Sequence, residues 1–363
     1  MENRLIIFGL HELEGVGWKT MLQLLNRFPE PHMLFELSAA EIASKGIKAS
    51  IAEQISKRFT PDFIEQKLQL YMKQSVQILT LLDDDYPIIL KEIAQPPWVL
   101  YVKGKIACLN QRLLGIVGTR TPTLYGKKIA EDWAAALSRA GFGIVSGLAR
   151  GIDSRAHIGA LQGSSKTVAV LGCAINQIYP RENAQLYQMI EQEGAIISEY
   201  PVGTGMRSGM FPQRNRIIAG LSLGVMVVEA AEDSGSLITV DFALDESRDV
   251  FAVPGPIHSR QSSGVHKLLK DGAKLVTQVE EIVDDYKYLI SMEDRSALKK
   301  PLSVYSLSDD EHEIVQLLSN EPISFDALLD GRQFTFGHLH AVLLSLVLKK
   351  AIKQLPGSTY ILA

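Results

Sequence analysis

The sequence predicts an α/β protein built around a parallel sheet that helices cover on both faces. From about residue 105 to 285, short apolar runs alternate with amphipathic helical patterns, for example at 127–140 and 183–193. Apolar strands that alternate with such helices are typical of a parallel sheet buried between two helical layers. The predicted strands are Leu113–Val117, Gly143–Val145, Thr167–Leu171, Ala195–Ser198, Gly224–Val228, Val250–Val253 and Lys274–Val276.

The segment before this sheet predicts a helical domain. Residues 1–80 carry Leu, Ile and Phe at three- and four-residue spacing. Within them, Gly15-Val16-Gly17 predicts a tight turn between two helices, which either contacts a DNA phosphate or forms a packing corner. Prolines then interrupt any helix between residues 83 and 104, and Trp98–Val102 is predicted as an edge strand that introduces the main domain.

The segment after the sheet predicts a linker and a small third domain. A polar stretch to about residue 310 contains Lys299-Lys300-Pro301 and is predicted as the linker. Residues 311–363 show two helical patterns followed by a short β-ribbon with a Pro-Gly turn, which is the shape of a winged helix. The stretch 334–348 is apolar and poor in Arg, so a partner or dimer surface is favoured there over a reader of the major groove.

Composition excludes several classes of protein. The 363 residues are 46% hydrophobic, and 37 Lys and Arg stand against 41 Asp and Glu, for a net charge of −4. A polyanion would therefore have to be held by a local cluster of cations. Cys108 and Cys173 lie among apolar residues and predict small core side chains rather than a disulfide. Neither a membrane-spanning run nor a signal-peptide profile is present, so a cytoplasmic protein is expected.

Two loops that follow predicted strands have the character of phosphate-binding turns. Each combines glycine, a hydroxyl side chain and an arginine, which lets the backbone approach an anion and offers a bidentate guanidinium. The candidate residues are Gly118, Thr119 and Arg120 in the first loop and Ser146, Gly147 and Arg150 in the second. Because adjacent parallel strands lie about 5 Å apart, Arg150 is expected near Arg120. Asp153 and His157, one helical turn apart, form either a proton relay or, in the favoured interpretation, a cap or buried hydrogen bond.

A third segment, Phe211-Pro212-Gln213-Arg214-Asn215-Arg216, predicts an arginine-rich turn at the start of a helix. Phe211 could stack on a base while Arg214, Asn215 and Arg216 hold phosphate oxygens. A fourth segment, Ser234-Gly235-Ser236, opens a predicted helix and suits a phosphate or a ribose.

Catalysis and cofactors are not predicted. The glycine fingerprint of dinucleotide sites and the Walker pattern are both absent, and the histidines have no metal-ligand spacing. Glu229 and Asp241 lack a nucleophile partner, and Ser234 and Ser236 lack an elbow motif. We therefore expect no catalytic residue, no metal and no cofactor.

The order of these motifs resembles the DNA-processing protein A (DprA, also called Smf) family. The shared runs include Tyr179-Pro180-Arg181-Glu182-Asn183, Ser198-Glu199-Tyr200-Pro201 and Val253-Pro254-Gly255 besides the segments above. The resemblance implies a sterile-alpha-motif or helix-hairpin-helix domain at 1–80, an extended Rossmann-like DNA-binding core at 81–290, a linker at 291–310 and a winged-helix-like domain at 311–363. Thr119 stands where the family commonly has Ser, and His266 where Asn is common.

What the resemblance implies about function is a non-catalytic mediator of natural transformation. Such a protein binds single-stranded DNA in a positive pocket, dimerises and loads the recombinase RecA. Arg120, Arg150, Phe211, Arg214 and Arg216 would line the pocket. Two alternatives remain open: a nucleotide phosphoribohydrolase, although the Pro-Gly-Gly-x-Gly-Thr loop of those enzymes is not intact here, and a transcription regulator, which only the winged-helix-like tail supports.

Overall fold

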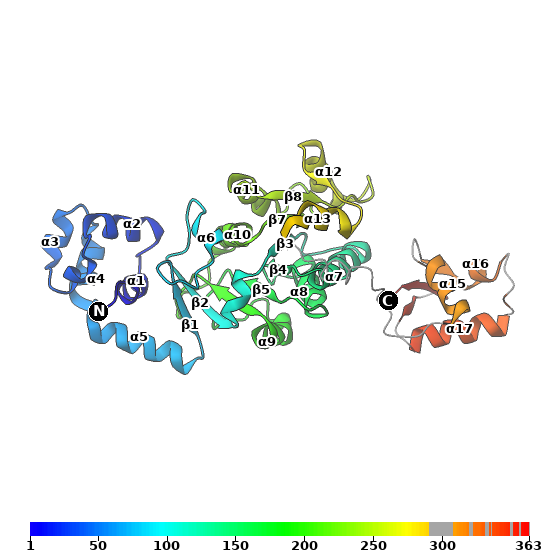
Figure 1. Cartoon of the computed structure of the whole chain (residues 1–363), viewed down its shortest axis with the longest axis horizontal. Helices are drawn as coiled ribbons and strands as arrows, with labels where there is room; N and C mark the ends of the chain where they lie inside the picture. The colour runs from blue at the N-terminus through cyan, green and yellow to red at the C-terminus, as the bar shows by residue number, and fades with distance from the viewer. Residues whose placement is uncertain are drawn as a thin grey trace. The chain divides into compact units, whose positions relative to one another are not determined.

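The computed structural model describes residues 1–289, 308–318, 322–330, 334, 336–348, 351–355 and 357–362. The chain divides into two compact units, Met1–Leu298 and Lys299–Ala363 (Figure 1). Most of the predicted linker at 291–310, including Lys299-Lys300-Pro301, lies outside the described residues.

The first unit is built on a nine-stranded sheet in the order β1-β2-β6-β5-β4-β3-β7-β8-β9. In this order, all strands from β6 through β5, β4, β3, β7 and β8 to β9 run parallel. By contrast, β2 pairs antiparallel with β6, and β1 pairs antiparallel with β2. The bounds are β1 Gln77–Thr80, β2 Val99–Gly104, β3 Leu113–Val117, β4 Gly143–Ser146, β5 Thr167–Val170, β6 Ala195–Ser198, β7 Gly224–Val227, β8 Asp249–Ala252 and β9 Lys274–Leu275. Each predicted strand is therefore present, and the extended Rossmann-like fold is confirmed.

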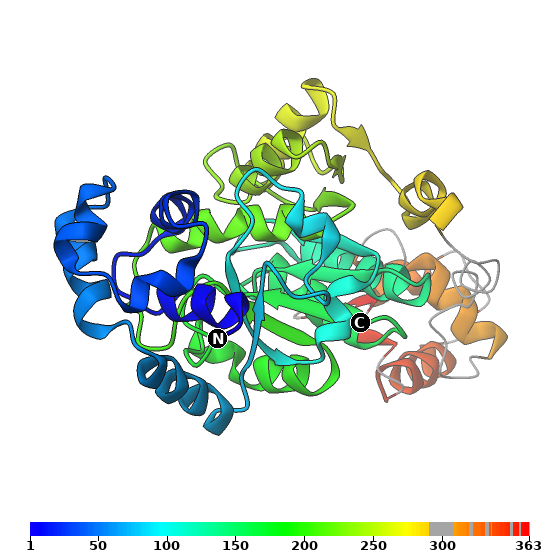
Figure 2. The same cartoon turned by 60° about the vertical axis from the view of Figure 1, so that its left-hand side comes forward.

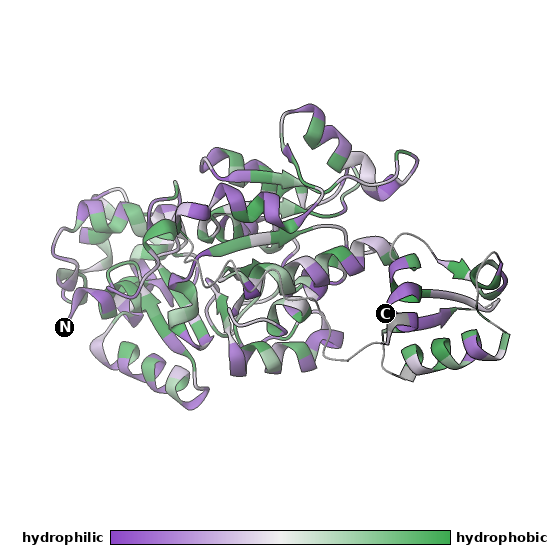
Figure 3. Cartoon of the chain, turned by 45° about the vertical axis from the view of Figure 1, so that its right-hand side comes forward, coloured by the Kyte–Doolittle hydropathy of each residue, from purple (hydrophilic) through white to green (hydrophobic). Residues whose placement is uncertain are grey.

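Helices cover both faces of this sheet, as the alternation predicted. One face carries α7 Leu124–Arg139, α8 Ile152–Leu161, α9 Ala184–Glu193 and α13 Val279–Asp285. The other face carries α6 Ile88–Lys91, α10 Met210–Leu221, α11 Leu237–Asp245 and α12 Ser263–Lys270. In Figure 3 the central strands are mostly hydrophobic, while the covering helices alternate between hydrophobic and hydrophilic residues. The core thus consists of two apolar layers, one on each side of the sheet.

The prediction of an edge strand at Trp98–Val102 is wrong. β2 forms hydrogen bonds to strands on both sides, and β1 occupies the edge instead. The helical pattern of residues 1–80 hid β1, because its apolar residues Ile78 and Leu79 continue the spacing of the preceding helix α5. Predicting the edge position would have required knowing that this short segment pairs with β2.

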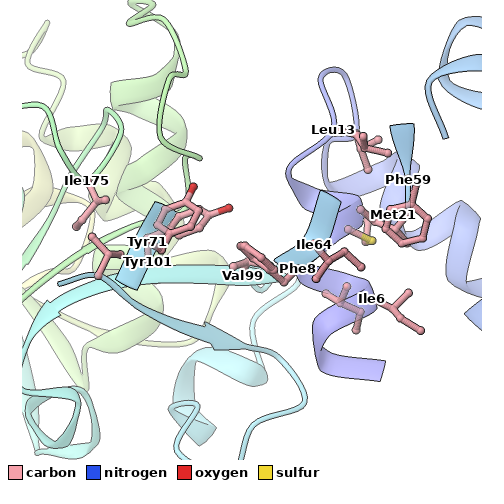
Figure 4. Packing of buried hydrophobic residues seen from close by; sticks show 14 of the residues in the cluster. Ile6, Phe8, Leu13, Met21, Phe59, Ile64, Tyr71, Val99, Tyr101 and Ile175 are labelled. Carbon is pink, nitrogen blue, oxygen red and sulfur yellow. The ribbon is translucent and has the colours of Figure 1, made fainter. Parts of the chain in front are cut away.

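The N-terminal helices gather beside the β1 end of the sheet (Figures 1 and 2). They are α1 Asn3–His11, α2 Trp18–Arg27, the 3₁₀ turn η1 Pro31–Phe35, α3 Ala39–Ser44, α4 Ala49–Arg58 and α5 Pro61–Lys73. Their apolar residues form one continuous cluster with side chains of the sheet, which include Val99 and Tyr101 (Figure 4). The helical segment and the sheet therefore share a hydrophobic core.

The turn between α1 and α2 is a packing corner. Val16 is buried, and Gly15 has a φ of +81°, a conformation that favours glycine. Trp18 donates its indole N–H to the Pro96 carbonyl at 2.8 Å, and Trp98 donates its own to the Trp18 carbonyl at 3.2 Å. These two hydrogen bonds hold the turn against the segment that leads into β2. Contact of the corner with DNA stays a prediction.

The second unit has the winged-helix fold that its sequence pattern predicted. Its described elements are α15 Asp309–Leu317, β10 Ile323–Ser324, α16 Phe325–Leu329, α17 Phe336–Leu348, β11 Ile352–Leu355 and β12 Thr359–Leu362. β11 and β12 form the predicted antiparallel ribbon, and β10 pairs antiparallel with the other side of β12. Of the predicted Pro-Gly turn, Pro356 lies outside the described residues.

Both cysteines are buried without a disulfide, as predicted. Among the described residues, no helix is long and apolar enough to cross a membrane, and no group of three or more His, Cys, Asp or Glu side chains could hold a metal ion.

Candidate functional site

The strand order has a switch point, where the chain stops adding strands on one side of β3 and begins adding them on the other side. From β3 the chain moves outward through β4, β5 and β6 with helices on one face, then returns through α10 on the other face to β7, beside β3. Ligands of such sheets bind at this switch point, beyond the carboxyl ends of the strands. A hollow of about 520 Å³ lies there, between the loops that follow β3 and β7, and is called the switch-point hollow below.

Most of the predicted site residues line this hollow. They are Gly118, Thr119, Arg120, Phe211, Arg214, Asn215, Ser234, Gly235 and Ser236. Three segments that lie far apart in the sequence therefore converge, as the motif positions at strand ends predicted. Whether these residues bind DNA stays a prediction.

The loop after β3 is held at both ends by Glu229. The Thr119 N–H donates to the main-chain carbonyl of Glu229 at 2.6 Å. The buried Glu229 carboxylate accepts from the N–H of Thr123 at 2.9 Å and from its hydroxyl at 2.5 Å, just before α7 begins. A Cβ on Gly118 would come within 2.7 Å of that Glu229 carbonyl, so only glycine fits there. Glu229 thus acts as a structural anchor, with both carboxylate oxygens engaged.

Arg120 projects from this anchored loop into the hollow. Its side chain is exposed, and within the described part of the chain it forms no hydrogen bond or ion pair. A guanidinium on a fixed backbone loop that has no carboxylate of its own is suited to a phosphate.

The loop after β4 is fixed by Asp153, the first-turn acid of α8. Its carboxylate accepts from the N–H groups of Gly147 at 3.1 Å and Ala149 at 3.4 Å. Burial raises the pKa of Asp153, and the charge of Arg214 opposes that rise. His157 is bonded to Thr167 at 2.7 Å rather than to Asp153. Of the favoured alternatives, a cap or a buried hydrogen bond, the buried hydrogen bond is therefore confirmed over the proton relay, whereas α8 has no side-chain cap.

Arg214 forms the floor of the hollow rather than its rim. The residue is 5% exposed, and its guanidinium donates to the carbonyl of Gly147 at 2.7 Å and to that of Val170. A Cβ on Gly147 would lie 2.4 Å from the guanidinium, so glycine makes room for it. Burial lowers the pKa of Arg214, while the carboxylate of Asp153 opposes that shift. Its positive charge remains beneath the hollow, since no carboxylate forms a hydrogen bond to it among the described residues.

The prediction of an arginine-rich turn at a helix start is wrong. Helix α10 begins at Met210, so Phe211 and Pro212 occupy its first turn and the arginines lie in the following turns. Because proline is well tolerated in the first turn of a helix, Pro212 was the sequence signal that the helix starts before the arginines.

Arg216 does not line the switch-point hollow. Its side chain is 6% exposed and forms an ion pair with Glu199, at 2.6 and 3.2 Å between the paired nitrogens and oxygens. Ser146 is also buried and donates its hydroxyl to the Ile116 carbonyl at 2.7 Å. Both residues were predicted to bind DNA, and the structure gives each a structural contact instead.

A narrow neck of about 40 Å³ adjoins the switch-point hollow. Arg120, Phe211 and Arg214 line both spaces, and Gly147 and Arg150 line the neck. The expected approach of Arg150 to Arg120 is thus confirmed. Arg150 already has a partner, because Glu182 accepts two hydrogen bonds from it, each of 2.8 Å, in an exposed ion pair.

The far side of the switch-point hollow is lined by the start of α11. Ser234 and Ser236 lie 2.8 Å apart through their hydroxyls, and Asn215 donates to the Gly235 carbonyl at 3.3 Å. The N–H groups at the start of a helix favour an anion. The predicted suitability of this segment for a phosphate therefore agrees with its place beside the hollow.

Two residues that line these spaces were given no role from the sequence. Arg260, in the 3₁₀ turn η4 Arg260–Ser262, lines the hollow and pairs with Asp233 at 3.3 Å. Tyr179 lines the neck, with its ring centroid 5.2 Å from that of Phe211. Arg260 follows the carboxyl end of β8, and Tyr179 follows that of β5. This position after a strand was the one sequence signal that could have indicated a role in the site.

These observations define a class. The protein is Rossmann-like, with cations and backbone N–H groups around an open hollow at the switch point, and such a site suits phosphorylated ligands. The chain belongs to the family of DNA recombination-mediator protein A, whose model matches residues 77–287. A second model, the DprA winged helix domain, matches residues 299–358.

Curated relatives and solved structures agree with this membership. The chain is 40% identical over 240 residues to DNA processing protein DprA of Bacillus subtilis, covering 66% of this chain and 80% of the relative. It is 36% identical to protein Smf of Synechocystis over 81% of this chain and 82% of the relative. The X-ray structure of DprA from Streptococcus pneumoniae matches with a TM-score of 0.68 and 34% identity, over 78% of this chain and 97% of that one.

A further match is a structure of DNA processing protein A from Helicobacter pylori, with a TM-score of 0.54 and 30% identity over 59% of this chain and 98% of that one. That structure concerns the single-stranded DNA binding mode of the Helicobacter pylori protein.

Proposed function

We propose that this protein binds single-stranded DNA in the switch-point hollow and acts as a mediator of DNA recombination. The observation that carries the proposal is Arg120, an exposed guanidinium on an anchored loop with no carboxylate partner among the described residues. The family and the single-stranded DNA binding mode of the Helicobacter pylori relative support the same ligand.

The chemistry of the hollow accounts for a preference for single strands. Arg120, the α11 start and the charge of the buried Arg214 attract phosphates, and Phe211 offers an aromatic face to a base. In a duplex the faces of the bases are already stacked on one another, so Phe211 has no partner there. These contacts read no base edges, so little sequence preference is expected.

The non-catalytic part of the proposal rests on how the acidic residues are used. Glu229 is engaged through both carboxylate oxygens as the anchor of the Thr119 and Thr123 backbone. Asp153 is engaged with the loop after β4. Each has a structural task, and the matched family is described as a mediator. Release of free base from nucleoside monophosphates would instead favour the phosphoribohydrolase alternative.

The finer parts of the proposal are supported by the family alone. They are loading of RecA during natural transformation, a homodimer and a cytoplasmic site of action. Light scattering of the purified chain tests the dimer. The rate at which RecA filaments form on DNA coated with single-strand-binding protein tests the loading, and no acceleration by this protein would contradict it.

The test of the binding site is fluorescence anisotropy with labelled single- and double-stranded oligonucleotides. Arg120→Glu should weaken single-strand binding strongly, because it replaces an attraction to phosphate with a repulsion. Lys91→Glu is the matched control, since Lys91 is exposed on α6 and lines none of these spaces. Unchanged affinity in Arg120→Glu would reject the hollow as the site.

A further inference from the structure

A third space continues the neck on the side away from the switch point. This outer hollow, of about 710 Å³, is lined by Gln177, Ile178, Tyr179, Arg181, Ala184 and Met206. Tyr179 lines the neck as well, so the three spaces follow one another across the carboxyl edge of the sheet. No function was assigned to the outer hollow by the sequence motifs.

The boundary between the neck and the outer hollow is a pair of aromatic rings. Phe211 and Tyr179 have centroids 5.2 Å apart and ring planes at 49° to each other. Phe211 rests against Gly172, where a Cβ would come within 2.6 Å of its ring. Tyr179 is 44% exposed. Phe211 borders the switch-point hollow, and Tyr179 borders the outer hollow.

The outer hollow also has its own cation. Arg181 is exposed, and its side chain forms no hydrogen bond or ion pair within the residues that the structure describes. Along the three adjoining spaces, unpaired Arg120 therefore lies on one side of the aromatic pair and unpaired Arg181 on the other. Met206, 42% exposed, adds an apolar surface to the same hollow.

We infer that the outer hollow is a second subsite for single-stranded DNA, in which Tyr179 stacks on a base and Arg181 holds a phosphate. This inference rests on the proposed function and extends its site. The neck, at about 40 Å³, is too small for a base. The strand therefore passes over the neck with its backbone and places bases in the hollows on either side.

A polynucleotide is favoured as the ligand because the two hollows and the neck adjoin one another. A polynucleotide presents phosphates and flat apolar bases in regular succession, and alternating arginines and aromatic rings match that succession. A single nucleotide would fill only one of the two hollows.

The test is a ladder of oligothymidylates of increasing length, bound to the whole chain and followed by anisotropy. Tyr179→Leu removes the ring face and keeps an apolar side chain against Phe211. Its affinity should fall about 5- to 20-fold for long oligonucleotides, the lower part of the range for one stacked base. The shortest oligonucleotides, which fill only the switch-point hollow, should bind the variant as they bind the wild type.

Three further variants make the result specific. Tyr179→Phe keeps the ring and should bind like the wild type at each length. Tyr288→Ala removes a tyrosine that is 76% exposed and lines none of these spaces, so it should also bind normally. Arg181→Ala should lower the slope of log affinity against log salt by about 0.7 for long oligonucleotides only.

The location of the base can be tested directly. Oligonucleotides that carry 5-iodouracil at one position at a time should crosslink to Phe211 and, at a neighbouring position, to Tyr179. Crosslinks confined to Phe211, or equal loss of affinity in Tyr179→Leu at every length, would overturn the second subsite. Failure of the wild type to bind, or of Arg120→Glu to weaken binding, would instead reject the proposed function.

Discussion

Arg214 and Arg216 on α10 carry the same guanidinium group as Arg120, in the loop after β3, and Arg181, in the 3₁₀ turn η3 Arg181–Asn183, but in opposite surroundings. The first two are each 5% exposed and are bonded to backbone carbonyls or to Glu199. The other two are exposed and, in the described part of the chain, lack hydrogen-bonded partners. All four lie in runs of sequence that carry the family resemblance.

The difference teaches that an arginine in a motif can build a site or bind its ligand, and that burial separates the two tasks. A buried arginine must satisfy its donors within the protein, because an unpaired buried charge is costly. An exposed arginine with no partner keeps its donors for a ligand. Substitutions in the two groups should therefore damage different properties.

The largest expected effect is on stability, from Arg216→Met. This change leaves the Glu199 carboxylate, whose side chain is only 13% exposed, without its ion-pair partner, and the free energy of unfolding should fall by about 3–5 kcal/mol. Denaturant unfolding of the single and double variants measures it. Glu199→Leu combined with Arg216→Met should recover most of the loss, because two apolar side chains replace both charges. Equal losses in the single and double variants would show that the ion pair is not the cause.

The second effect is acid destabilisation through His157, beneath Arg214. Its Nδ1 bonds to the Thr167 hydroxyl, which itself donates to the Ile144 carbonyl, so Nδ1 carries the hydrogen. Burial, and then the charge of Arg214, lowers the pKa of His157 from 6.5 to about 3. Because the pKa of His157 is lower in the folded chain than in the unfolded chain, the unfolded chain binds the proton more readily. The stability that the neutral His157 gives is therefore complete above pH 6.5 and is lost as the pH falls towards 3.

One proton taken up on unfolding gives a slope of up to about 1.4 kcal/mol per pH unit in that range. Unfolding by urea at a series of pH values measures the slope. His157→Asn keeps a donor towards Thr167 but cannot take up the proton, so its slope should be flatter. An identical slope in both proteins would exclude His157 as the origin.

The third effect is on binding alone, from Arg120→Ala. Loss of a charged hydrogen bond to phosphate should weaken single-strand affinity by about 1.5–3 kcal/mol. The free energy of unfolding should stay within about 0.5 kcal/mol of the wild type, because the side chain is exposed. Anisotropy and denaturant unfolding on the same preparation measure both. A large loss of stability would place Arg120 with the buried arginines instead.

The smallest effect is a gain, from Glu182→Gln. Glu182 occupies the guanidinium of Arg150 in an exposed pair, so a phosphate must displace it. Since such pairs are worth about 0–1 kcal/mol, neutralising Glu182 should raise single-strand affinity up to about fivefold. Anisotropy against the wild type at low salt measures the gain. Weaker binding by Glu182→Gln would indicate that the pair positions Arg150 for the ligand.

The comparison also shows what the sequence could predict. Periodicity predicted the strands of the parallel sheet, and the position of each motif after a strand predicted that Arg120, Phe211 and Ser234 would meet at one edge. The sequence could not predict which arginines are buried. Arg216 is buried because Glu199, on the segment after β6, lies opposite it, and that pairing depends on the packing of α10 across the sheet.

Two other features escaped prediction for similar reasons. β1 is short and continues an apolar helical pattern, so its place at the sheet edge depends on pairing with β2. Tyr179 acquires significance only because its ring meets that of Phe211, which comes from a different element. Both depend on contacts between distant segments rather than on local pattern.

The most direct test of the central claim is the salt dependence of single-strand affinity in the wild type and in Arg120→Ala. If Arg120 holds a phosphate in the switch-point hollow, the slope of log affinity against log salt should become shallower by about 0.7 in the variant. An unchanged slope would contradict the account, because it would show that DNA binds without neutralisation of its phosphate charge by Arg120.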